Sequence, residues 1–151
     1  MSFRACSLLG LVLLLAGCGP SEPPCTGDKC PKVGGTYLVD APSVDASQST
    51  CKAFEWRGGS GTATLEQQDS VLTLKNFLAT ITGTLFSTGA ATFRDTHVDT
   101  TATKDSFTMS MVGTFKGPEG AKVLKGTMVF LKKEGNCSLN VPVTMTQQSA
   151  Q

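Results

Sequence analysis

The sequence is poor in charge and in the side chains that carry out catalysis. Charged residues make up 17% of its 151 residues, and together with 16 Gly this excludes a long, salt-bridged helix or coiled coil. The formal net charge is only +1, so we expect no nucleic-acid partner, which would require a concentrated basic patch. The chain has one His, which excludes a Ser-His-Asp triad built on any other histidine. Its length is that of one domain, too short for a large barrel enzyme.

Three short motifs could carry chemistry, and each lacks its usual context. Gly58–Thr62 reads GGSGT, which has Thr where a nucleophile elbow needs its last Gly. Ser49–Lys52 satisfies S-x-x-K, but the accompanying S-D-N and K-T-G motifs of β-lactamases do not occur in the sequence. His97 lies between Asp95 and Asp99, and alternate side chains on a strand are about 7 Å apart, too wide to hold one ion without bending. We therefore predict no enzyme activity, no cofactor and no metal site.

The first 17 residues are organised as a targeting segment. Arg4 supplies a positive charge, and the apolar run Ala5–Ala16 is shorter than the roughly 20 residues that span a bilayer core. Leu15-Ala16-Gly17-Cys18 closely resembles the lipobox of bacterial lipoproteins. In that family the signal peptide, here residues 1–17, is cleaved just before the cysteine, whose thiol carries a diacylglyceryl group and whose new amino group is usually acylated.

This resemblance implies a lipid anchor on Cys18 and a place in the cell envelope. Gly19, which is not Asp, favours the outer membrane by resemblance to enteric-type sorting. Residues 18–33 contain four prolines and predict an extended spacer between the anchor and the domain. The globular domain is then expected over residues 34–151. Because Arg4 is the only charged residue of the signal, the mature chain has 12 basic and 12 acidic residues.

Four cysteines remain beyond the signal and the lipid site, and an even number outside the cytoplasm indicates disulfides. Cys25 and Cys30 flank a Gly-Asp turn and are expected to pair with each other. Cys51 then pairs with Cys137, which joins the two ends of the domain. A four-cysteine zinc site is the competing interpretation, but the usual second closely spaced pair is missing.

From Gly34 onward, short Thr-rich, β-branched and aromatic runs alternate with turn residues. Gly117–Gly120, which reads GPEG, is the clearest turn because Pro fixes φ at its second position. No helix-period segment separates the runs, which predicts an antiparallel meander. The candidate strands are Thr36–Asp40, Cys51–Trp56, Gly61–Gln67, Val71–Phe77, Ala79–Phe86, Ala91–Val98, Ser106–Lys116, Val123–Lys132 and Ser138–Thr146. For Cys51–Trp56, an irregular arm or a short helix is the alternative.

Polar and apolar residues alternate along these runs, so each strand has one dry face. A meander of about eight strands hides its dry face and its edges by closing into a small up-and-down β-barrel. A β-sandwich is the alternative. Gly83, Gly113 and Gly126 lie inside runs, as glycines do at the corners of barrels. The layout is similar to that of lipocalin-like and other small meander-barrel lipoproteins, although Tyr37 stands where many lipocalins have Trp.

These features predict a non-catalytic interaction or assembly module at the membrane surface, whose partner is an envelope protein or the cell wall. The alternative is a barrel that binds a small hydrophobic molecule or a lipid. That ligand would contact the apolar face formed by Phe107, Met109, Met111 and Phe115. Trp56, followed by Arg57 in a glycine-rich segment, is either an interface anchor or a half-buried plug of the barrel.

Overall fold

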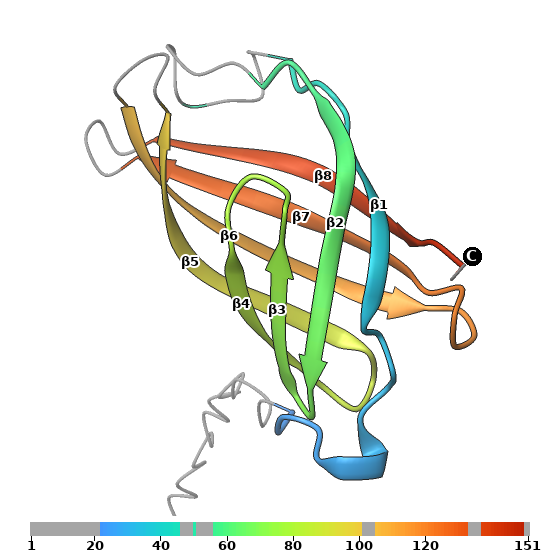
Figure 1. Ribbon diagram of the computed structural model, residues 1–151. Helices are drawn as coiled ribbons and strands as arrows, with labels where there is room; N and C mark the ends of the chain where they lie inside the picture. The colour runs from blue at the N-terminus through green and yellow to red at the C-terminus, as the bar shows by residue number, and fades with distance from the viewer. Residues whose placement is uncertain (1–21, 46–49, 51–55, 101–104, 133–136, 150–151) are drawn as a thin grey trace, which may run out of the picture.

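The computed structural model forms a closed barrel of eight antiparallel strands (Figure 1). It describes residues 22–45, 50, 56–100, 105–132 and 137–149, with the backbone alone for residues 95–100 and 105–106. The strands are β1 (Gly35–Ala41), β2 (Gly59–Gln68), β3 (Val71–Lys75), β4 (Ile81–Leu85), β5 (Ala90–Thr100), β6 (Asp105–Lys116), β7 (Val123–Lys132) and β8 (Cys137–Gln147). Each strand pairs with the next, and β8 pairs with β1 through Tyr37–Asp40. The predicted up-and-down barrel is confirmed over the alternative sandwich.

The strand predictions hold in type and order, with shifted ends. β4 begins at Ile81, because residues 76–80 form the connection from β3. β5 extends to Thr100, and its pairing with β6 shifts register between Phe93 and Thr96. Most of the candidate strand Cys51–Trp56 lies outside the described residues, and Trp56 itself forms an isolated antiparallel bridge with Val44.

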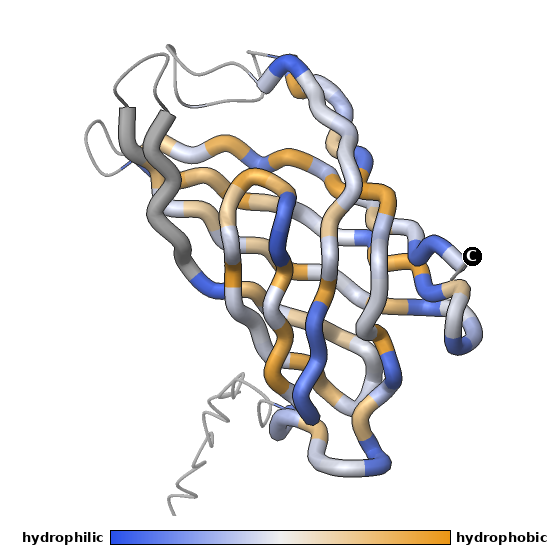
Figure 2. Tube along the Cα trace, viewed as in Figure 1, coloured by the Kyte–Doolittle hydropathy of each residue, from blue (hydrophilic) through white to orange (hydrophobic). Residues whose placement is uncertain are grey.

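Alternation along the strands decides which side chains fill the barrel, and Figure 2 shows hydrophobic and hydrophilic positions alternating along the trace. On β8, Leu139, Val141, Val143 and Met145 are buried while the residues between them face outward. Every strand contributes to one continuous hydrophobic core. The largest fully buried side chains are Tyr37, Phe93, Leu65, Leu72, Leu74, Ile81, Leu85, Met109, Met111, Leu124, Met128 and Leu139.

The interior glycines mark places where neighbouring strands leave no room for a side chain. Gly113 and Gly126 lie opposite each other on β6 and β7. A Cβ on Gly126 would overlap the carbonyl oxygen of Val112, and a Cβ on Gly83 would lie 2.7 Å from the carbonyl oxygen of Thr92. Close approach of the neighbouring strand's backbone is the reason that glycine stands at these inward-facing positions.

The segment before β1 packs across one end of the barrel, which we call the η1 end after the 3-10 helix η1 (Gly27–Lys29). The Cys25 N–H donates to the carbonyl of Leu85 at 3.1 Å, and Val33 is fully buried. The Gln67 side chain accepts from the N–H of Val33 at 2.7 Å and donates to the carbonyl of Pro31 at 2.9 Å. Residues 22–33 are therefore part of the folded domain, unlike the free spacer predicted for residues 18–33, because the barrel end supplies partners for their backbone.

The described residues between β1 and β2, which are 42–45, 50 and 56–58, lie at the opposite end of the barrel. The N–H of Val44 donates to the carbonyl of Trp56 at 3.0 Å, and the Val44 side chain is buried. Thr50 is tied to the start of β8, since the Ser138 N–H donates to its Oγ1 at 2.7 Å. Described residues outside the strands therefore make contacts at both ends of the barrel.

Candidate functional site

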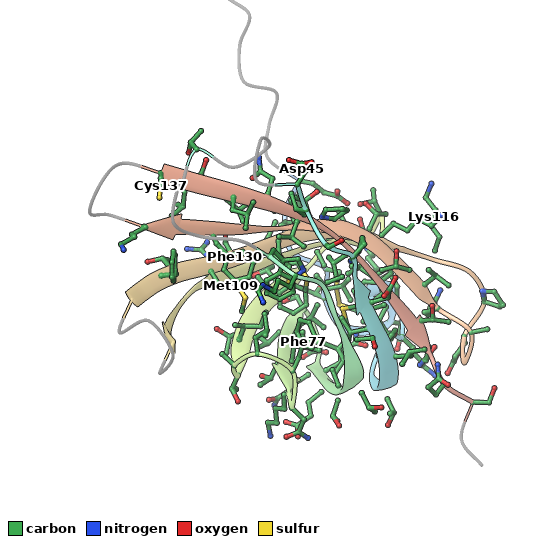
Figure 3. All side chains as sticks on the ribbon, turned by 90° about the horizontal axis from the view of Figure 1, so that it is seen from above. Asp45, Phe77, Met109, Lys116, Phe130 and Cys137 are labelled. Carbon is green, nitrogen blue, oxygen red and sulfur yellow. A yellow bond between two sulfur atoms is a disulfide. The ribbon has the colours of Figure 1, made fainter. Side chains whose placement is uncertain are left out.

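The four residues predicted to contact a ligand all point into the barrel. Phe107, Met109, Met111 and Phe115 have between 1% and 4% of their surface exposed and belong to the hydrophobic core. Phe115 meets the Tyr37 ring edge to face, with the ring centroids 6.0 Å apart. Seen along the barrel, Met109 lies beside Phe130 in the middle of the molecule (Figure 3). Their inward orientation follows from the alternation on β6, and binding of a ligand there stays a prediction.

Tyr37 ties the core to the η1 end. Its hydroxyl donates to the carbonyl of Val33 at 2.6 Å in a buried setting. Burial raises the pKa of Tyr37 above the ordinary value for a tyrosine, because the charged phenolate would lose its hydration. The phenol therefore stays protonated and acts as a hydrogen-bond donor, which is a structural and not a catalytic role.

Trp56 is half-buried at the end opposite η1, where it packs on the core. Its ring stacks on Phe130 with centroids 5.4 Å apart, and its Nε1–H donates to the carbonyl of Ala41 at 3.1 Å. Arg57 follows with its side chain exposed. These contacts immobilise the indole and leave part of its surface in solvent beside a cation. The half-buried ring agrees with the interpretation of Trp56 as a plug of the barrel, and its use as an interface anchor stays a prediction.

Two clefts formed by described residues lie on the outside of the barrel. The larger, of about 880 Å³, lies between the start of β1, the turn from β6 to β7 and the end of β8. Gln147 holds its walls together, since its Nε2 donates to the Gly34 carbonyl at 2.9 Å and its Oε1 accepts from the Lys122 N–H at 3.0 Å. The smaller, of about 370 Å³, is lined by Thr114, Lys116, Val123 and Lys125. The titratable side chains that line them are Glu119 in the larger cleft and Lys116 and Lys125 in the smaller.

The three cysteines that the structure describes are all disulfide-bonded. Cys25 and Cys30 form a disulfide, as predicted. Cys137 is also disulfide-bonded, and its predicted partner Cys51 lies outside the described residues, as does Cys18. Within the described part of the chain, no three His, Cys, Asp or Glu side chains are placed to hold a metal ion. The side chains of Asp95, His97 and Asp99 are not among those described.

Glu22 and Gln67, which sequence analysis did not identify, hold the N-terminal segment on the η1 end by hydrogen bonds. The Glu22 carboxylate accepts hydrogen bonds from Ser87 Oγ at 2.6 Å, Thr88 Oγ1 at 2.9 Å and the Thr88 N–H at 3.2 Å. The hydrogen bond from Ser87 is the main cause that lowers the pKa of Glu22. Gln67 joins β2 to Pro31 and Val33. No local signal identifies these partners, because each pair is separated by more than 30 residues in the chain.

Comparison with known proteins adds no family assignment. No family model, curated protein or solved structure matches the chain. Among the residues whose structure is described, no helix is long and apolar enough to cross a membrane.

Proposed function

We propose that the protein is a lipid-anchored lipoprotein of the bacterial cell envelope, in the outer membrane, and that its barrel is a non-catalytic interaction or assembly module. The lipobox Leu15–Cys18 supports the anchor. The barrel has buried, hydrogen-bonded polar contacts and one continuous core, which support a rigid scaffold. Two or three acyl chains on Cys18 would hold it stably at the membrane.

The observation that carries the proposal is the attachment of Glu22 to the barrel. Only residues 19–21 separate Cys18 from Glu22, and the four Cα–Cα steps between these two residues span at most about 14 Å. The lipid on Cys18 would therefore hold the η1 end of the barrel at the membrane surface. The opposite end, with Trp56 and Arg57, is the end farthest from the attachment point and the one available to a partner.

The described interior favours this role over that of a small-molecule carrier. Phe107, Met109, Met111 and Phe115 pack within the core, and Val33 and Val44, at opposite ends of the barrel, are buried against it. An exposed edge of the half-buried Trp56 beside Arg57 has the composition of an interface anchor, since Trp and Arg are enriched where binding energy is concentrated.

The test uses the full precursor expressed in a bacterial envelope. Wild-type protein is expected to incorporate a fatty-acid probe and to fractionate with the outer membrane, whereas the Cys18→Ser variant does neither. A photo-crosslinking residue in place of Arg57 is then expected to give one discrete protein adduct, and the same residue in place of Asp28, in η1, is expected to give lipid adducts. Normal labelling of Cys18→Ser would refute the anchor, and lipid adducts at position 57 would refute the orientation.

A further inference from the structure

Among the side chains that the structure describes, those on the outer surface of β6, β7 and β8 include no acidic residue. Fifteen side chains alternate with the buried ones on these three strands and face outward. They are Thr108, Ser110, Val112, Thr114 and Lys116 on β6, Val123, Lys125, Thr127, Val129 and Leu131 on β7, and Ser138, Asn140, Pro142, Thr144 and Thr146 on β8. We call this surface the β6–β8 face. Its two charged residues are both lysines.

The charges and the apolar groups are separated along the β6–β8 face. In the half farther from η1, direct cross-strand neighbours form three uncharged rows, such as Val112, Thr127 and Pro142. Val112 and Leu131 there are 49% and 43% exposed. Lys116 and Lys125 lie at the other end of the face, where they line the smaller cleft. A surface of hydroxyls and short apolar side chains therefore adjoins a cationic end.

The N-terminal chain leaves the barrel beside that cationic end. Glu22 is bonded to Ser87 and Thr88 in the turn between β4 and β5. The same turn is joined to the end of β6, because the Phe115 N–H donates to the carbonyl of Gly89 at 2.8 Å. Lys116 is the next residue along β6. The short link to Cys18 thus begins next to the lysines of the β6–β8 face.

The outward side chains of β1, β2 and β3 have a different character. They include Asp40, as well as Glu66, whose carboxylate lies 2.6 Å from Lys75 Nζ. Since Lys75 balances Glu66, Asp40 gives the described outward side chains of β1–β3 one net negative charge, and an anionic surface would attract the two lysines of the β6–β8 face instead. The β6–β8 face also has no Trp, Tyr, Phe or Arg, the residues that anchor most protein interfaces. Its composition therefore fits a lipid headgroup surface better than a protein.

We propose that the β6–β8 face lies against the anionic phospholipid headgroups of the membrane to which the chain is anchored. This inference rests on the proposed lipid attachment at Cys18. Lys116 and Lys125 would contact lipid phosphates near the attachment point, and the hydroxyl-rich rows with Val112 and Leu131 would lie on the headgroup layer. The η1 end would stay at the attachment point, and the barrel would tilt about it so that the β6–β8 face lies on the headgroups and β1–β3 are turned away from the membrane.

The test places the lipidated protein in vesicles of phosphatidylglycerol and phosphatidylethanolamine. A photo-crosslinking residue in place of Val112 is compared with the same residue in place of Val71, an equally apolar and 55% exposed position on β3. At least about fivefold more lipid adduct is expected at position 112. The Lys116→Gln/Lys125→Gln variant is expected to reduce that adduct at least about fivefold, since each lysine near an anionic surface contributes about that factor. Lys75→Gln, on the opposite side, is the matched control and is expected to leave it unchanged.

The outcomes separate the two proposals. The mass of the mature protein reports the acyl chains independently of the crosslinks, and their absence would refute the anchor and this inference together. Acylated protein that gives equal lipid adducts at positions 112 and 71 would overturn the inference alone. An adduct at position 112 to a second copy of the chain, or to another protein, would also overturn it.

Discussion

The Ser87 hydroxyl donates a hydrogen bond of 2.6 Å to the carboxylate of Glu22, 65 residues earlier in the chain. Glu22 is the first described residue, and Ser87 lies in the turn from β4 to β5. This contact fixes where the N-terminal chain leaves the barrel. It therefore links the predicted lipid site to the orientation of the domain at the membrane.

Substitution of Glu22 is expected to loosen the segment at the η1 end. The Glu22→Gln variant should lower the exchange protection of the Cys25 amide, which donates to Leu85, because the charged acceptor of the Ser87 and Thr88 hydrogen bonds is lost. Glu66→Gln, which removes an exposed carboxylate on β2, is the control. Equal protection of the Cys25 amide in wild type and Glu22→Gln would contradict the prediction.

The Glu22–Ser87 contact also predicts that the segment at the η1 end loosens at acidic pH. Hydrogen bonding lowers the pKa of Glu22 in the folded protein below the value of about 4.5 expected when unfolded. The contribution of Glu22 is therefore complete above about pH 4.5 and is lost as the pH falls through the lower folded pKa. Protection factors of the Cys25 amide, measured by hydrogen exchange and corrected for intrinsic rates, should fall in that acidic range in wild type. They should not change there in Glu22→Gln.

Removal of the Tyr37 hydroxyl should destabilise the barrel without disturbing its core. The Tyr37→Phe variant retains the ring that meets Phe115 but leaves the buried Val33 carbonyl without its donor. We expect the free energy of unfolding in urea to fall by about 1–2 kcal/mol. Because burial raises the pKa of Tyr37, the hydroxyl's contribution should be present below about pH 10 and be lost as the pH rises further. An unchanged urea midpoint would show that the hydrogen bond contributes nothing.

Two glycines give a matched test of close strand packing. Gly126→Ala would place a Cβ against the carbonyl oxygen of Val112 and the Cα of Gly113. It should lower the free energy of unfolding by about 2 kcal/mol or more, as overpacking does in a tight core. Gly61→Ala, with no atom within 4 Å of the new Cβ, should change stability by less than about 1 kcal/mol. Equal effects in thermal unfolding would refute the packing argument.

The Cys25–Cys30 disulfide closes a short loop, so its contribution should be modest. The Cys25→Ala/Cys30→Ala variant is expected to lose about 2 kcal/mol of unfolding free energy. A double substitution is needed because Cys137 is also disulfide-bonded and a reductant would act on both bonds. A loss above about 4 kcal/mol in denaturant unfolding would mean that the loop's packing, and not its closure, dominates.

Much of the barrel could be predicted because its signals are local. The inward orientation of Phe107, Met109 and Met111 follows from a period of two along one strand. A turn near Gly117–Gly120 follows from the chemistry of Pro and Gly, but the hydrogen-bonded turn runs one residue later, over Pro118–Ala121, with Gly120 at its third position in positive φ. The contact of Trp56 with Phe130 could not be predicted, since it joins residues far apart in the chain.

Alternation, turn residues and the short signal segment are properties of neighbouring residues, and they were enough to predict the class of fold, the strand order and the candidate anchor at Cys18. Local patterns do not explain two other features. These are the packing of residues 22–33 on the barrel and the composition of the β6–β8 face. They depend on the pairing of β8 with β1 and on the register between distant strands. Closure of the barrel brings Glu22 to Ser87 and collects fifteen outward side chains on one surface, and no stretch of sequence encodes those distances.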